Sequence, residues 1–125
     1  MPIDAKQPYD DANIFAKIVR GEVPAKTVME SEHSIAFHDI NPLAPIHVLV
    51  IPKGRYVSWD DFAATASDTE IADFTRTIGK VAQMVEADTQ GYRILSNIGK
   101  RGGQEVPHLH VHIFGGAPLG PMLGI

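Results

Sequence analysis

The chain has 125 residues, of which 44% are hydrophobic and 21% are charged, and its formal net charge is −4. This length and composition predict one soluble domain with its own core. The acidic balance argues against nucleic-acid binding, and the absence of cysteine excludes disulfides and thiolate metal sites. No apolar run approaches the roughly 18 residues that span a bilayer, and the N-terminus lacks the apolar core of a signal peptide. We therefore expect a cytoplasmic protein with no membrane partner.

The N-terminal half is predicted to contain an arm, one helix and three strands, over about 1–10, 12–20, 26–31, 34–39 and 46–51. We expect the arm to be loosely held. Asp10 or Asp11 is expected to cap the helix, and Gly21 is expected to follow its last turn. The third strand is apolar except for His47, a pattern that is typical of a central strand buried on both faces.

The C-terminal half is predicted to contain a short helix, a long helix, a strand, a glycine-rich loop and a last strand, over about 60–65, 68–88, 92–97, 99–103 and 108–114. Ser67 and Glu70 have the spacing of a capping box, and apolar residues then recur at intervals of three and four. Residues 117–125 are expected to form a tail. Two main helices with several short strands predict a single α+β domain with an antiparallel sheet.

The last predicted strand carries His108, His110 and His112 at alternate positions. Alternate side chains of a strand point to the same face, so this spacing places three imidazoles together. A neutral imidazole can attack phosphorus and form a covalent phosphoryl-histidine, and no metal is required for that step. The glycine-rich loop that precedes the histidines can offer backbone N–H groups to a phosphate. His110 has a histidine on each side and is the candidate nucleophile.

Several upstream residues each have two interpretations. His47 could face the same site, or it could be a buried histidine that is hydrogen-bonded in the sheet. Asp39 could accept hydrogen bonds from ribose hydroxyls, or it could cap the turn at Asn41-Pro42. Four apolar residues could line a pocket for a base or belong to the core: Ile14, Phe15, Phe37 and Ile40. His33 and His38 have the pattern of surface or structural residues.

The run from Gly103 to His112, followed by the apolar Ile113 and Phe114, resembles the signature of the histidine-triad (HIT) superfamily. Two further blocks, 13–26 and 36–53, are similar to its Hint branch of nucleotide-binding proteins, and the similarity covers about 13–116. The resemblance implies a single HIT domain over 1–125. It also implies a five-stranded antiparallel sheet with two main helices, and a homodimer in which two sheets join into ten strands. The implied activity is hydrolysis of purine nucleoside 5′-phosphoramidates through a nucleotidyl-histidine, with no cofactor and no metal.

The resemblance also assigns roles to residues of this chain. His110 is the implied nucleophile, His112 and His47 contact phosphate and handle protons, and His108 supports the array. The implied phosphate-side positions are Asn97, Gly103, Gln104, Glu105 and Val106. The implied positions around a purine nucleoside monophosphate or phosphoramidate are Asp39, Ile14, Phe15, Phe37, His38 and Ile40.

Two departures from the family pattern bear on substrate choice. Animal members carry a serine at the position of Glu105, where a carboxylate would repel phosphate, favour an amine leaving group or point away. The tail lacks the tryptophan that some members place near the leaving group. Three other functions stay open: a histidine zinc site, a nucleotide-binding module with little turnover, and a dinucleoside polyphosphate hydrolase that uses the same intermediate.

Overall fold

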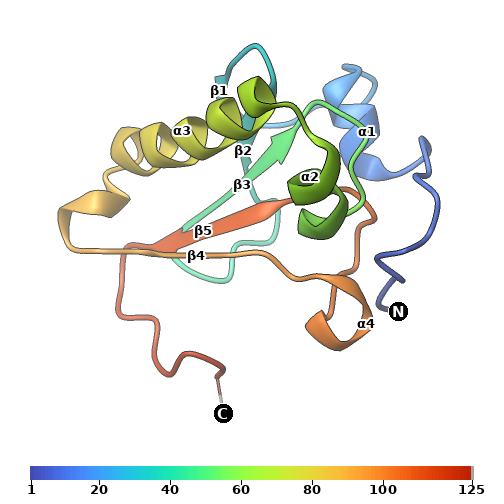
Figure 1. Cartoon of the computed structure of the whole chain (residues 1–125). Coiled ribbons are helices and arrows are strands. Elements are labelled where there is room, and N and C mark those ends of the chain that lie inside the picture. Colours follow the sequence, from blue (N-terminus) through green and yellow to red (C-terminus); the bar gives the residue numbers. More distant parts are fainter. Residues whose placement is uncertain (125) are drawn as a thin grey trace.

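Five strands form one antiparallel sheet in the order β1-β2-β3-β5-β4 (Figure 1). A computed structural model describes residues 1–124. The strands are β1 (Thr27–Glu30), β2 (Ser34–His38), β3 (Ile46–Pro52), β4 (Arg93–Leu95) and β5 (Val111–Gly115). The helices are α1 (Ile14–Val19), α2 (Trp59–Thr65), α3 (Asp68–Met84), the 3-10 turn η1 (Ala87–Thr89) and α4 (Gly99–Gly102). The predicted α+β class with a five-stranded antiparallel sheet is confirmed.

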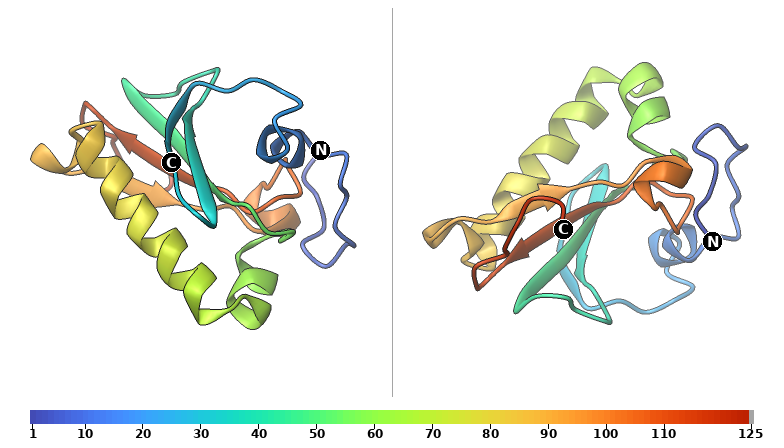
Figure 2. Two further views of the ribbon diagram at one scale, coloured as in Figure 1. Left: turned by 90° about the horizontal axis from the view of Figure 1, so that it is seen from above. Right: turned by 90° about the horizontal axis from the view of Figure 1, so that it is seen from below.

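The sheet separates two cores, and α3 and α1 lie on opposite faces of it (Figure 2). The α3-side core contains Ala36, Val48, Val50, Phe62, Phe74, Ile78, Val81, Ala82, Ala87, Leu109, Val111 and Ile113. The α1-side core contains Phe15, Ile35, Phe37, Leu49 and Ile51. Residues 48–51 of β3 alternate between the two cores, which confirms that this strand is central and buried on both faces. Among residues 1–124, no helix has both the length and the apolarity needed to cross a membrane.

The helix starts follow local hydrogen-bonding rules. The side chain and backbone of Ser67 exchange hydrogen bonds with Glu70, so the predicted capping box of α3 is confirmed. The predicted cap of α1 is wrong. Asn13 caps this helix, because its Oδ1 accepts a hydrogen bond from the Ala16 N–H at 2.9 Å. Asp10 instead orients that cap, since its backbone carbonyl accepts a hydrogen bond from the Asn13 side chain at 2.7 Å.

The histidine segment departs from the predicted strand at its beginning. The predicted strand covers 108–114, whereas β5 begins at Val111, so His108 and His110 precede the sheet ladder. The Leu109 N–H pairs with the carbonyl of Tyr56 at 2.9 Å, in the connection after β3. The predicted alternation still holds, because Leu109 and Val111 enter the α3-side core while the histidines face the other way.

Other boundaries also differ from the prediction. The long helix ends at Met84 rather than near 88, because Glu86 adopts a left-handed backbone with φ of +62°. The strand predicted over 92–97 is confined to β4, and the predicted glycine-rich loop contains the single turn α4. The tail was expected over 117–125. Arg93 donates to the carbonyl of Gly120 at 3.0 Å, and Ile125 lies outside the described residues.

Residues 1–10, expected to be a loosely held arm, are instead fastened to the histidine segment. The Ile3 N–H donates to the carbonyl of Gln104 at 2.8 Å. The Tyr9 hydroxyl lies 2.6 Å from Nδ1 of His108. These contacts join positions about a hundred residues apart, and no local sequence pattern reveals such a pairing.

Candidate active site

His110 has a defined protonation pattern. Its Nδ1 lies 2.8 Å from the backbone carbonyl of His108, and because a carbonyl can only accept, the proton resides on Nδ1. The other ring nitrogen, Nε2, therefore carries a lone pair. Burial lowers the pKa of His110 below its usual value, so the ring is neutral at pH 7. A buried, neutral imidazole with a fixed tautomer is suited to nucleophilic attack.

His108 is held at both ring nitrogens and is fully buried. Its Nε2–H donates to the carbonyl of Pro52 at 2.8 Å, so Nδ1 is left to accept from the Tyr9 hydroxyl. Burial lowers the pKa of His108 to about 4. His108 is thus a neutral residue whose backbone orients the next histidine in the series.

His47 and His112 form a directly hydrogen-bonded pair. The Leu43 N–H donates to Nδ1 of His47 at 3.1 Å, so the proton of this ring is on Nε2. That Nε2 lies 2.9 Å from Nδ1 of His112 and 3.4 Å from an oxygen of Asp39. His112 must then accept at Nδ1 and carry its own proton on Nε2. The arrangement leaves a ring N–H on the imidazole next to His110.

Sheet register places this pair beside the nucleophile. In the β3–β5 ladder His47 is opposite Phe114, and Leu49 is opposite His112, so the two histidines are diagonal neighbours on the α1-side face. The ring centroids of His110 and His112 are 5.2 Å apart. Burial, and to a smaller degree the neighbouring His110 and His47, lower the pKa of His112 to about 4. A lone pair on one ring and a donor on the next therefore lie on one face.

An open cavity of about 1050 Å³ lies between α1, β2 and the β2–β3 connection, and of the four site histidines His47 is the one that lines it. Its lining includes every residue expected around a nucleoside: Ile14, Phe15, Phe37, His38, Asp39 and Ile40. His47 is therefore both buried in the sheet and exposed to the cavity. Residues 23–26, Pro42 and Pro45 also line it, and no local sequence pattern predicts them. The walls are mainly apolar, which suits the flat face of a base.

The turn-cap interpretation of Asp39 is confirmed, and its ribose-binding interpretation stays a prediction. One of its oxygens accepts the Asn41 N–H at 2.8 Å and caps the turn. The second faces His47, and the residue lines the cavity. Ile40 is 91% exposed and forms the outer rim rather than a wall.

Gln104 is one of the expected phosphate-side positions, and its side chain lies inside the protein. Gln104 is 1% exposed, and its side-chain nitrogen donates to the carbonyls of Val57 at 2.6 Å and Val106 at 3.0 Å. Its side-chain oxygen accepts the Gly99 N–H at 3.0 Å. This placement differs from the expected phosphate contact, because each side-chain polar atom already has a partner within the protein. Gln104 braces the loop.

The other loop residues have varied positions. The Glu105 side chain is 69% exposed, and one oxygen lies 3.5 Å from the N-terminal ammonium of Met1. Val106 packs against the α1-side core, and Asn97 is half-buried just before α4. Gly103 has a φ of +77°, a conformation that favours glycine.

Asp39, His47 and His112 are also the one group among residues 1–124 whose side-chain donors converge as metal ligands would, within 4.8 Å of one another. A metal-bound histidine normally donates its other ring N–H to an acceptor. His47 does the reverse, because its Nδ1 accepts a backbone N–H and its Nε2 holds the proton. The donor set therefore suits proton sharing better than metal binding.

Comparison with known proteins identifies the family. Residues 20–119 match the family model described as the HIT domain. An uncharacterized HIT-like protein of Azospirillum brasilense is 59% identical over 115 residues, which cover 92% of this chain and 94% of the relative. The purine nucleoside phosphoramidase of Escherichia coli (strain K12) is 38% identical over 113 residues, which cover 90% and 94%.

Solved structures agree. A HIT family hydrolase from Clostridium thermocellum superposes with a TM-score of 0.82 at 36% identity, covering 91% of this chain and 98% of that one. A histidine triad protein from Clostridium difficile gives a TM-score of 0.78 at 41% identity, with coverage of 87% and 94%. The chain therefore belongs to the HIT-domain family, as its histidine motif predicts.

Proposed function

We propose that this protein hydrolyses purine nucleoside 5′-phosphoramidates through a covalent nucleotidyl intermediate on His110. The observation that carries the proposal is the hydrogen bond from Nδ1–H of His110 to the carbonyl of His108, which leaves the Nε2 lone pair free. The similarity to the E. coli purine nucleoside phosphoramidase supports the same reaction class. The nucleoside would occupy the apolar cavity, with ribose hydroxyls at Asp39.

In the first step, Nε2 of His110 attacks phosphorus, the N–P bond to histidine forms, and the P–N bond to the amine breaks. The departing amine needs one proton. A bound phosphate anion raises the pKa of nearby imidazoles, so Nδ1 of His112 would take up a proton when substrate binds, and the Nε2–H of His47 would turn to the Asp39 carboxylate. Asp39 faces that pair and would stabilise its positive charge. His112 then gives the proton on its Nε2 to the amine and keeps the proton on Nδ1.

In the second step, water attacks phosphorus and the bond to His110 breaks. One proton of the water returns to the His47–His112 pair, and the second hydrogen stays on the new phosphate oxygen until it ionises. His110 regains its lone pair, so protons and charge balance over the cycle. The Nε2–H of His112 would donate to a phosphate oxygen when substrate binds, before this proton passes to the amine, and the attacking water returns a proton to the same nitrogen.

The oligomeric state is a second part of the proposal. β4 is an edge strand, and its residue Ile94 is 52% exposed, near Tyr92 at 40%. Unpaired edges with apolar side chains tend to pair with another strand. We propose that two copies pair through this edge, which joins two five-stranded sheets into one of ten.

The test is turnover of adenosine 5′-phosphoramidate in the presence of a chelator. We expect release of adenylate by the wild type and none by His110→Ala. His33→Ala is the matched control, because His33 lies beside Glu32 on the β1–β2 connection. No turnover by the wild type would overturn the proposal, and adenylate binding without turnover would instead indicate a binding module. Cleavage of diadenosine polyphosphate alone would indicate the related hydrolase.

A further inference from the structure

The arm before α1 supplies a contact to the histidine series that lies outside the family match. The match begins at residue 20, whereas Tyr9 is eleven positions earlier. The Tyr9 hydroxyl and Nδ1 of His108 are 2.6 Å apart, and the two rings meet edge to face with centroids 5.6 Å apart. The nitrogen takes no proton of its own, because Nε2–H already donates to Pro52, so the phenol is the donor.

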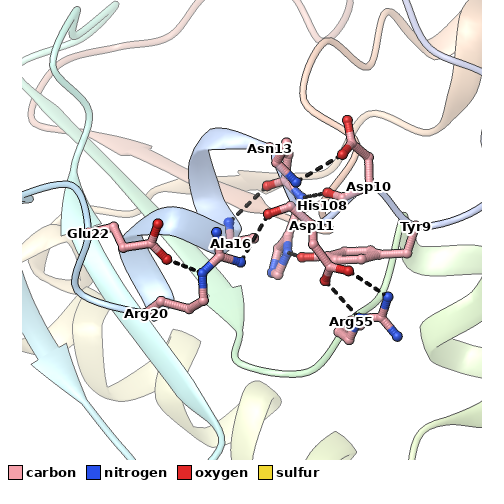
Figure 3. Close-up of polar contacts among 10 residues, drawn as sticks. Tyr9, Asp10, Asp11, Asn13, Ala16, Arg20, Glu22, Arg55 and His108 are labelled. Atoms are coloured by element: carbon pink, nitrogen blue, oxygen red, sulfur yellow. Dashed lines mark hydrogen bonds and ion pairs between the residues drawn. The ribbon is translucent and has the colours of Figure 1, made fainter.

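The ion pair between Arg55 and Asp11 lies beside Tyr9 (Figure 3). The Arg55 guanidinium lies 5.1 Å from the centre of the Tyr9 ring. Two of its nitrogens donate to the two oxygens of Asp11, each at 2.9 Å. Arg55 follows Pro52 by three residues and Asp11 follows Tyr9 by two. The two segments that bind the opposite nitrogens of His108 are thus fastened to each other, and they close a ring of contacts around it.

We propose that Tyr9 is a positioning residue for the nucleophile: its hydroxyl fixes the ring of His108, and the carbonyl of His108 in turn fixes the proton on Nδ1 of His110. The catalytic part of this role presupposes the nucleophile proposed above. Tyr9 would not touch substrate. It acts through one neighbouring residue, along hydrogen bonds of 2.6 and 2.8 Å.

Loss of the hydroxyl would leave Nδ1 of a buried ring without its donor. An unpaired buried acceptor is unfavourable, so the ring would rotate, admit water or take up a proton. The titratable groups that act on His108 are Tyr9, His110 and Asp61, and Arg55 lies over the Tyr9 ring. Each outcome would displace the His108 carbonyl or change the field at His110, and small displacements of reacting groups reduce rates.

The test compares Tyr9→Phe with Tyr56→Phe. The first removes only the hydroxyl and keeps the ring under Arg55. The second is a matched control, because the Tyr56 hydroxyl donates to Glu70 at 2.9 Å and does not contact His108. Each variant is measured by steady-state turnover of adenosine 5′-phosphoramidate and by nitrogen-15 NMR of the histidine rings.

For Tyr9→Phe we expect kcat to fall roughly three- to tenfold, the usual range for one hydrogen bond, with KM nearly unchanged. We also expect shifted Nδ1 resonances of His108, and His110 signals that indicate a mixture of two tautomers. Tyr56→Phe should change neither. Unchanged His110 signals in Tyr9→Phe, or unchanged kcat with altered signals, would overturn the positioning role. If the wild type shows no turnover, the proposed function fails, and the His110 signals alone still decide whether Tyr9 fixes the tautomer.

Discussion

Nε2 of His47 and Nδ1 of His112 share a hydrogen bond of 2.9 Å although the residues are 65 positions apart. Three features fix the proton of that bond on His47: the Leu43 N–H at its other nitrogen, the carboxylate of Asp39 nearby, and the antiparallel register of β3 with β5. The consequence is that His112 points an N–H, rather than a lone pair, from its second nitrogen. The hydrogen bond therefore runs from His47 to His112, and His112 is the member of the pair that offers an N–H to a substrate.

We predict that His47→Ala lowers kcat/KM by about 10²- to 10³-fold, the usual contribution of a positioned proton-transfer group. The substitution removes the partner that fixes the tautomer of His112. Steady-state kinetics at pH 7 with adenosine 5′-phosphoramidate measures it, and His33→Ala serves as the surface control. An activity within threefold of the wild type would contradict the direction assigned to the pair.

Asp39→Asn separates the turn cap from the negative charge. The amide oxygen of asparagine can still accept the Asn41 N–H, so the turn should persist. The charge facing His47 and the ribose is lost, and we expect adenylate to bind roughly tenfold more weakly or worse, because a hydrogen bond to a charged group is lost. Isothermal titration with adenylate and with inorganic phosphate checks this. Equal weakening for both ligands would show that Asp39 does not contact the nucleoside.

The depressed pKa values predict the pH dependence of the reaction. His110 must be neutral to attack, and its pKa lies below the ordinary 6.5 because the ring is buried. The acid limb of kcat/KM, which reports the free enzyme, should therefore fall below pH 6.5. A pH–rate profile from 4 to 8 measures it. Half-loss of kcat/KM at or above pH 6.5 would contradict a buried neutral nucleophile.

The same shifts predict a loss of stability in acid. The pKa of His108 is 6.5 in the unfolded reference and about 4 in the folded protein, so the unfolded state binds more protons between these values. Its stabilising contribution is complete above pH 6.5 and is lost as pH falls toward 4, by roughly 3 kcal/mol. Urea unfolding at pH 7 and 4.5 should show the fall, and His108→Gln should show a smaller one. If the free energy of unfolding falls equally in the wild type and in His108→Gln, His108 does not contribute to the loss of stability in acid.

Substitution of Gln104 is expected to lower the free energy of unfolding more than substitution of Glu105. Gln104→Leu leaves the carbonyls of Val57 and Val106 without their donor, and the free energy of unfolding should drop by about 2 kcal/mol or more. Glu105→Gln, which alters an exposed ion pair, should change it by less than about 0.5 kcal/mol. Chemical denaturation measures both. Similar values for the two variants would contradict the bracing role.

The dimer proposal predicts twice the 13.6 kDa chain mass in light scattering after size-exclusion chromatography. Ile94→Lys places a charge on the exposed edge of β4 and should give a monomer. A wild-type monomer at micromolar concentration would rule out the joined sheet, and a dimer that survives Ile94→Lys would point to a different interface.

The histidine alternation, the central strand around His47 and the capping box at Ser67 were all predictable from the sequence. Each depends on a periodicity or a spacing of a few residues, which local geometry converts directly into a structure. The sequence motif also predicted the HIT family, which the comparisons confirm.

Other features depend on contacts between residues that are far apart in the sequence. Tyr9 meets His108 across 99 positions, and Gln104 meets Val57 across 47. The sequence alone could not distinguish Gln104 as a brace from Gln104 as a phosphate ligand, because an amide side chain suits both and only its partners decide. Asn13 rather than Asp10 or Asp11 caps α1, and the sequence alone could not distinguish them because asparagine and aspartate are equally good caps.

The most direct measurement is mass spectrometry of the wild type quenched during turnover of adenosine 5′-phosphoramidate. The quench must be alkaline, because a phosphorus–nitrogen bond to histidine is labile in acid. The account predicts one adenylyl group per chain on the peptide that contains His110, and none in His110→Ala. Turnover without an adduct, or an adduct on another residue that persists in His110→Ala, would contradict the histidine nucleophile.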